Sequence, residues 1–205
     1  MNEDLDTARD DLAFLRALVS EGGQAQGAVG GGLLAGGLCY GLQCIAQWGM
    51  LVSGWQGPPL LGLAVGVLPT VIFLAILARL VIRDRKISHN GIGTRALNAA
   101  FGGAGLAAMT TATIFGYLAI RQQSITIWLF HPIMVCVVQG TVWYIAYAIR
   151  RRGWIGLVSG GWFASALLLT LLIGSHLFVL LLAFSLLLLM AFPGWLLMRN
   201  GPARR

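Results

Sequence analysis

Six long apolar runs constrain this chain more than any other feature. They cover approximately residues 28–51, 60–82, 97–120, 126–149, 154–173 and 177–198. An α-helix of about 20 apolar residues is long enough to cross the hydrocarbon core of a bilayer. In lipid such runs become helices, because a helix satisfies its own backbone hydrogen bonds. The sequence therefore predicts an all-α, polytopic integral membrane protein with six transmembrane helices in three hairpins.

The composition excludes the common soluble classes. Of the 205 residues, 58% are hydrophobic and only 10% are charged, whereas a soluble domain carries about 25% charged residues. A soluble enzyme and a disordered chain are therefore both excluded. The three cysteines all fall inside apolar runs, and this odd, lipid-embedded set argues against a disulfide scaffold.

The basic residues define an orientation for the bundle. They lie at the ends of apolar runs and form no single patch, so we do not expect nucleic acid as a partner. Arg121 alone belongs to one side. The other side holds Arg9, Arg16, Arg79, Arg83, Arg85, Lys86, Arg95, Arg150, Arg151, Arg152, Arg199, Arg204 and Arg205. The positive-inside rule then puts both termini in the cytoplasm. The Arg-rich and Gly-rich composition indicates a bacterial protein, and hence the plasma (inner) membrane.

The chain divides into a short cytoplasmic region, a bundle and a tail. Residues 1–26 are predicted to form a cytoplasmic amphipathic helix with a Gly-rich linker, 27–199 the six-helix bundle, and 200–205 a short basic cytoplasmic tail. Six of the seven acidic residues lie in the first 21 positions. An apolar stripe recurs there at steps of three and four residues: Leu5, Ala8, Leu12, Leu15 and Val19. This helix either rests against the basic cytoplasmic ends of the bundle or docks a partner protein or a second copy.

Glycine pairs spaced by four residues indicate close helix packing. The pairs are Gly32/Gly36, Gly37/Gly41, Gly62/Gly66 and Gly156/Gly160. In lipid such small-residue faces let two backbones approach each other closely. We expect the first helix to be the tightly packed centre of the bundle, and we expect the Gly-xxx-Gly faces to serve a protein partner or self-association.

A polar stripe is the best candidate for a functional site inside the bundle. Tyr40, Gln43 and Gln47 lie on one face of the first helix, and Gln139 is predicted to meet them across the bundle. The favoured interpretation is hydrogen bonding between helices. The alternative is a path for a neutral solute, which needs donors and acceptors but no charge.

Two histidines near the outer side leave a further alternative open. His131 and His176 could converge on a haem or a metal, but neither has a diagnostic spacing. We therefore expect His131 to be a hydrogen-bonded interface residue and His176 a turn residue, and we predict no cofactor and no metal site.

The apolar runs contain no Asp, Glu or Lys, and intramembrane ionisable groups are the usual indicators of membrane chemistry. We therefore do not expect an enzyme. The favoured function is a non-catalytic accessory, regulatory or assembly component that acts through partners. The alternative is a small permease or facilitator for a neutral or weakly polar solute, with one proline in each even-numbered helix as a point of flexibility.

Overall fold

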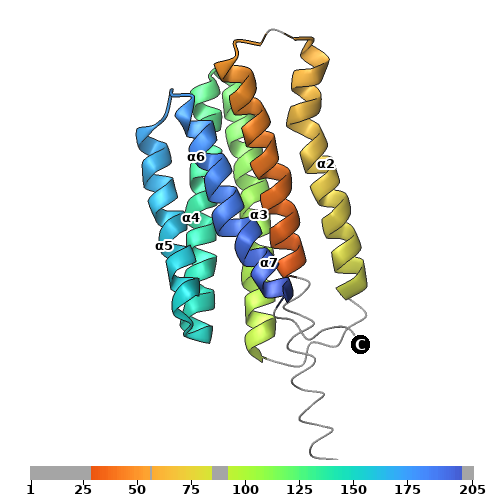
Figure 1. The fold of residues 1–205 in the computed structure, drawn as a ribbon, viewed down its shortest axis with the longest axis vertical. Helices are drawn as coiled ribbons and strands as arrows, with labels where there is room; N and C mark the ends of the chain where they lie inside the picture. Colours follow the sequence, from red (N-terminus) through yellow and green to blue (C-terminus); the bar gives the residue numbers. More distant parts are fainter. Residues whose placement is uncertain (1–28, 56, 85–91, 200–205) are drawn as a thin grey trace, which may run out of the picture.

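A computed structural model describes residues 29–55, 57–84 and 92–199, and all regular structure in these ranges is helical (Figure 1). The first helix spans Val29–Val52. It is followed by α2 (Pro59–Asp84), α3 (Ile92–Arg121), α4 (Ile125–Arg150) and α5 (Gly153–Leu171). The last helix is continuous but has three parts: α6 (Leu177–Leu186), the π-helical turn η1 (Leu187–Ala191) and α7 (Phe192–Arg199).

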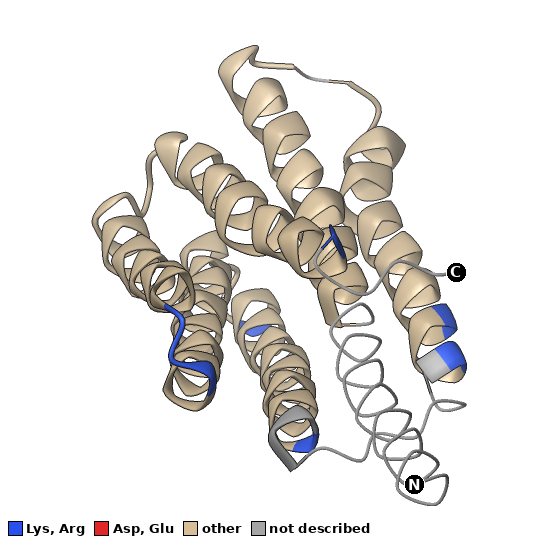
Figure 2. Cartoon of the chain, turned by 60° about the horizontal axis from the view of Figure 1, so that its bottom comes forward, with Lys and Arg blue, Asp and Glu red and all other residues tan. Residues whose placement is uncertain are grey.

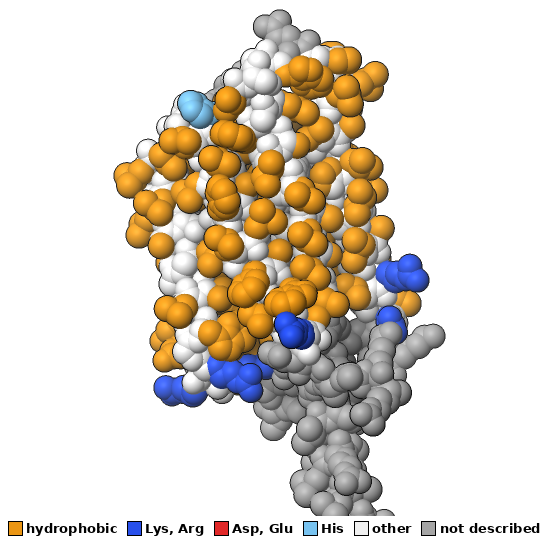
Figure 3. All heavy atoms as spheres, viewed as in Figure 1, with side chains coloured by type: hydrophobic (Ala, Val, Ile, Leu, Met, Phe, Trp, Pro, Cys, Tyr) orange, Lys and Arg blue, Asp and Glu red, His pale blue; other side chains and the backbone are white. Residues whose placement is uncertain are grey.

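The structure confirms the all-α prediction and the number of long apolar helices. Taking α6, η1 and α7 together as Leu177–Arg199, the described residues contain six helices long and apolar enough to cross a membrane. Their bounds agree with the predicted runs to within a few residues. Apolar side chains cover the middle of the face seen in Figure 3, and basic side chains lie below them.

The helices lie side by side, but not in chain order. In Figure 1, α2 is the outermost helix on one side and α5 the outermost on the other, with the first helix and α6 between them. α4 packs along both α3 and α5, and α5 also packs against α6 and η1. The first helix contacts η1 and α7 on one side and α2 on the other.

The buried core belongs mainly to the second half of the chain. The largest fully buried side chains are Trp143, Trp162, Phe178, Leu169, Pro193 and Cys136, which come from α4, α5 and the last helix. By contrast, none of the most apolar stretch of α2 is buried. α2 is therefore the least enclosed of the six helices.

Short turns at the helix ends follow from backbone conformation. Gly174, in the turn after α5, has a φ of 86°, a value that glycine adopts without steric cost. Arg151 closes α4 in the left-handed region, with a φ of 53°. Its backbone N–H donates to the Tyr147 carbonyl oxygen at 2.7 Å. Such a C-cap satisfies one of the last carbonyls of a helix.

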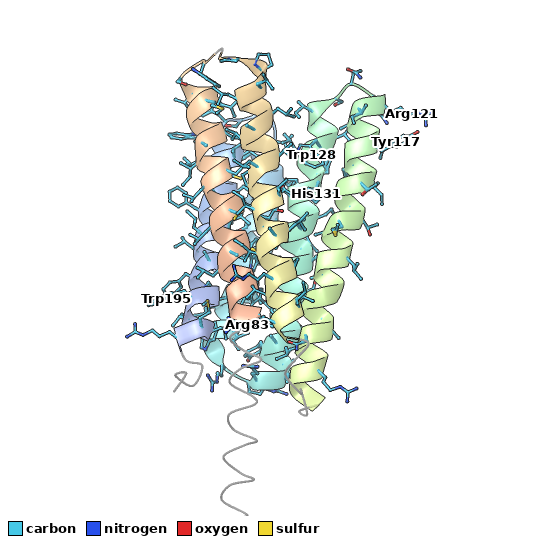
Figure 4. The ribbon with its side chains drawn as sticks, turned by 90° about the vertical axis from the view of Figure 1, so that its right-hand side faces the viewer. Arg83, Tyr117, Arg121, Trp128, His131 and Trp195 are labelled. Carbon is cyan, nitrogen blue, oxygen red and sulfur yellow. The ribbon has the colours of Figure 1, made fainter. Side chains whose placement is uncertain are left out.

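All described basic residues except Arg121 lie toward one end of the bundle (Figure 2). We call this the basic end, and it comprises Arg79, Arg83, Arg95, Arg150, Arg151, Arg152 and Arg199. Arg121 lies at the opposite end, as its label and that of Arg83 in Figure 4 show. Trp195 lies toward the basic end, and Tyr117 and Trp128 lie toward the other.

Candidate functional site

The predicted polar stripe of the first helix partly faces α2. Gln43 donates from Nε2 to the backbone oxygen of Gly66 at 3.2 Å. The ring of Tyr40 meets Phe73 edge to face, with 5.4 Å between centroids, and its hydroxyl faces the Thr70 side chain. These contacts are what hydrogen bonding between helices predicts, and they join α2 to the rest of the bundle.

The other two members of the stripe make no such contact within the described ranges. Gln47 and Gln139 are both half-buried. The Oε1 atom of Gln139 is buried and has no hydrogen-bond partner among the described residues, and the same is true of Gln43 Oε1. No hydrogen bond between described side chains joins Gln139 to the first helix, so the convergence of the four residues stays a prediction.

The first helix uses its glycines to approach the last helix. A Cβ atom added to Gly37 would collide with the backbone nitrogen of Ala191, and its distance from the Ala191 Cα would be 2.8 Å. One added to Gly41 would lie 2.8 Å from the Leu187 side chain, and one added to Gly194 would lie 2.5 Å from the Leu34 nitrogen. Only glycine permits this helix crossing, which is the close packing expected of the first helix.

Other glycines have open space beside them. Cβ atoms added to these would meet no other described part of the chain within 4 Å: Gly62 and Gly66 on α2, and Gly102, Gly103 and Gly105 on α3. The Gly37/Gly41 pair is therefore packed, whereas the identically spaced Gly62/Gly66 pair is not. A Cβ atom added to Gly32 would lie 3.8 Å from Leu77 of α2, and one added to Gly36 would lie 2.7 Å from Met190 of η1 and 3.1 Å from Phe73 of α2. In the remaining pair Gly156 contacts Tyr147, whereas Gly160 has open space beside it.

His131 joins α3 and α4 near the end opposite the basic end (Figure 4). The Thr111 hydroxyl lies 2.9 Å from the Ala107 oxygen and 3.0 Å from the Ala108 oxygen, to which it donates. His131 Nδ1 lies 3.2 Å from the same hydroxyl oxygen. The hydroxyl and the imidazole therefore form one hydrogen bond between α3 and α4, whose donor is set by the His131 tautomer.

The histidine geometry fits an interface role. The His131 ring also lies 5.1 Å from the Trp128 ring, measured between centroids. His176 is exposed and precedes α6. Within the described ranges, no group of three or more His, Cys, Asp or Glu residues could hold a metal ion.

A pocket at the basic end is the site that the sequence analysis missed. The first helix and the ends of α3, α4, α5 and α7 form its walls, and it is lined by aromatic and aliphatic side chains together with Asn98 and Arg150. Trp143 and Arg150 are seven residues apart on α4, so both fall on one helix face. That spacing is visible in the sequence, but it indicates a site only when the neighbouring helices are known.

The predicted docking stripe of residues 5–19 lies outside the described residues, as do the linker to residue 26 and the tail 200–205. Comparison of the chain with protein-family models, curated proteins and solved structures finds no match.

Proposed function

We propose that this chain is a multi-pass protein of a bacterial plasma membrane, with three hairpins and with its basic end and both termini in the cytoplasm. The six long apolar helices support membrane insertion. The distribution of arginine supports the orientation, because the described basic residues gather at one end and Arg121 alone lies at the other. Basic residues are enriched in cytoplasmic loops.

Within that membrane, the chain acts as a non-catalytic accessory or assembly component that binds a transmembrane helix of a partner protein. The observation that carries this proposal is the contrast between the two glycine pairs. Gly37/Gly41 is filled by the last helix of the same chain, whereas Cβ atoms added to Gly62 and Gly66 would meet no other described part of the chain within 4 Å. Small-residue faces mark helix contacts in lipid, so the unfilled pair fits a helix from another protein.

The surroundings of the unfilled pair support the same conclusion. Leu60 and Leu63 beside it are 77% and 63% exposed. α2 meets the first helix through Gly66, Phe73 and Leu77, and none of its most apolar stretch is buried among the described residues. α3 carries its own open glycines, Gly102, Gly103 and Gly105. Two helices of one bundle thus offer faces of the same kind.

The test is co-purification of the full-length, tagged chain from its native host in a mild detergent. Gly62→Leu fills the open face, and we expect it to abolish recovery of a stoichiometric partner. Ala64→Leu is the matched control, since Ala64 is also exposed on α2 but lies on a different side of that helix. Equal partner recovery with both variants, or the absence of any partner from the unmodified chain, contradicts the proposal.

The amino-terminal region is proposed as a second docking element. Deleting residues 1–22 removes the predicted apolar stripe and six of the seven acidic residues while leaving the described helices intact. If the stripe docks the partner, the deletion weakens co-purification even when Gly62 is unchanged. Unchanged recovery assigns binding to the membrane helices alone.

A permease for a neutral solute is the second candidate. Two buried amide oxygens favour it, Gln43 Oε1 and Gln139 Oε1, because neither has a hydrogen-bond partner among the described residues. Such acceptors suit a solute that carries hydroxyl or amide donors. Swelling of proteoliposomes in glycerol or urea tests this function. Loss of solute permeation in the Gln43→Leu and Gln139→Leu variants supports this function. Unchanged swelling in both variants rules out this path.

A further inference from the structure

The pocket at the basic end has an aromatic wall with an unpaired donor. Trp143 lines it and is only 2% exposed. The Trp143 ring centroid lies 5.7 Å from that of Phe101 and 6.1 Å from that of Trp154. Its indole Nε1 is buried without a hydrogen-bond partner among the described residues. Leaving a buried N–H unpaired costs about 1–3 kcal/mol, so an acceptor brought by a ligand is favoured here.

The same pocket contains a cation and an amide. Arg150 and Asn98 are half-buried and both line it, and the positive charge of Arg152 lies close to that of Arg150. None of the residues lining the pocket is acidic. Arg150 and Asn98 therefore bring donors, one of them permanently charged, to a space whose other walls are apolar or aromatic, and Trp143, whose indole N–H is unpaired among the described residues, forms part of those walls. This combination fits an amphiphile with an anionic head.

We propose that this pocket binds one anionic phospholipid, whose phosphate accepts hydrogen bonds from Arg150 and Trp143. The apolar walls, including Phe101 and Leu197, then contact the glycerol region and the start of an acyl chain. A guanidinium suits this role because it presents several donors to phosphate oxygens. The proposal rests on the membrane placement proposed above, and it does not depend on the existence of a protein partner.

A lipid fits the pocket better than the acidic residues 1–21 of the same chain. In the predicted amino-terminal helix most carboxylates lie on a different face from the apolar stripe. One face of that helix therefore does not match both Arg150 and the aromatic and aliphatic residues that make up most of the pocket. The basic end is also where lipid phosphates lie if the helices span a bilayer, because arginines and tryptophans at helix ends contact the headgroup layer. The expected ligand therefore reaches the pocket from the membrane itself.

The experiment is native mass spectrometry of the full-length chain, titrated in detergent with dioctanoyl phosphatidylglycerol. Dioctanoyl phosphatidylcholine and inorganic phosphate are titrated separately. Arg150→Gln removes the charge, and Trp143→Phe removes the indole donor while keeping an aromatic ring. Arg95→Gln is the matched control, since Arg95 is an exposed arginine of the same end and does not line the pocket. Thermal unfolding of each variant without lipid verifies that it folds.

We expect one phosphatidylglycerol to bind per chain. Arg150→Gln is expected to reduce the affinity about tenfold, because it removes a charged hydrogen bond, and Trp143→Phe is expected to reduce it by a smaller factor, because it removes a neutral one. Arg95→Gln and the unmodified chain are expected to bind alike. Equal losses in Arg150→Gln and Arg95→Gln overturn the assignment, because binding is then a general charge effect.

The other arms separate the sources of the anion. Equal affinity for phosphatidylcholine overturns the requirement for a net negative head. Inorganic phosphate that binds as tightly as phosphatidylglycerol shows a phosphate site without a lipid, and overturns the role of the apolar walls. Lipid binding that appears only after deletion of residues 1–22 overturns the proposal in favour of the acidic segment as the occupant. If no protein partner is recovered but lipid binding is intact, only the proposed accessory function is contradicted.

Discussion

The indole Nε1 of Trp162 donates a hydrogen bond to the backbone oxygen of Leu189 at 3.2 Å. Leu189 lies four residues before Pro193, which has no N–H to give to that oxygen. Leu189 also belongs to the π-helical turn η1, where the regular ladder of helical hydrogen bonds changes register. A fully buried side chain of α5 therefore supplies a donor that the proline cannot, and links α5 to the last helix.

Replacing Trp162 by Phe tests this link. The variant keeps most of the buried aromatic volume and loses the donor, so we expect it to lower the free energy of unfolding by about 1 kcal/mol, the usual scale for such bonds between membrane helices. The measurement is thermal unfolding of the purified chain in detergent. Trp55→Phe is the control, because Trp55 is 44% exposed. A Trp162→Phe melting temperature no lower than that of the control contradicts the role of the hydrogen bond.

Glycine at position 37 is required by backbone contact, and the same residue at position 62 is not. Gly37→Ala forces the first helix away from Ala191, whose backbone cannot move aside as a flexible side chain does. We expect a loss of about 1–3 kcal/mol, the range for overpacked cores. Gly62→Ala adds the same methyl group where no described atom lies within 4 Å. In detergent without a partner it is expected to unfold like the unmodified chain, and equal destabilisation by both changes would refute the distinction.

The glycine pairs also show how far the sequence could predict this fold. The spacing of four residues identifies Gly37/Gly41 and Gly62/Gly66 alike as packing faces, and only the arrangement of helices decides which pair is filled. The helices themselves were predictable, because about 20 apolar residues in a row have one regular structure in lipid. Which helices become neighbours was not, since apolar faces in lipid differ little from one another.

The candidate sites were likewise predictable within one helix but not between helices. Tyr40 and Gln43 share a face by helical period, and the structure places both against α2. The pocket at the basic end requires Phe101 of α3, Trp143 of α4 and Trp154 of α5 to meet. Contacts between three different helices leave no local pattern in the sequence. Taken alone, Arg150 indicates only the orientation of the chain in the membrane.

The hydrogen bond between Thr111 and His131 predicts a difference between two adjacent threonines. Thr111→Val removes the hydroxyl that is hydrogen-bonded to His131 Nδ1, whereas Thr110→Val removes only a hydroxyl that bonds to the Leu106 oxygen of its own helix. We expect Thr111→Val to destabilise the bundle by about 0.5–1.5 kcal/mol, and Thr110→Val to have little effect. Thermal unfolding of both variants at one pH measures this. Indistinguishable melting temperatures would show that the contact adds no stability between α3 and α4.

The uneven distribution of arginine predicts which surfaces of the chain are reachable from outside the cell. With Cys39, Cys44 and Cys136 replaced by Ala, a single cysteine is introduced at Ser53, beyond the first helix, or at Gly153, the first residue of α5. Neither change removes an arginine, so the charges that set the orientation are intact. We expect a membrane-impermeant maleimide to label the Ser53→Cys chain in intact cells, and the Gly153→Cys chain only after the membrane is permeabilised. The reverse pattern would place the basic end outside, and with it the pocket around Arg150, so that any lipid bound there would come from the outer leaflet.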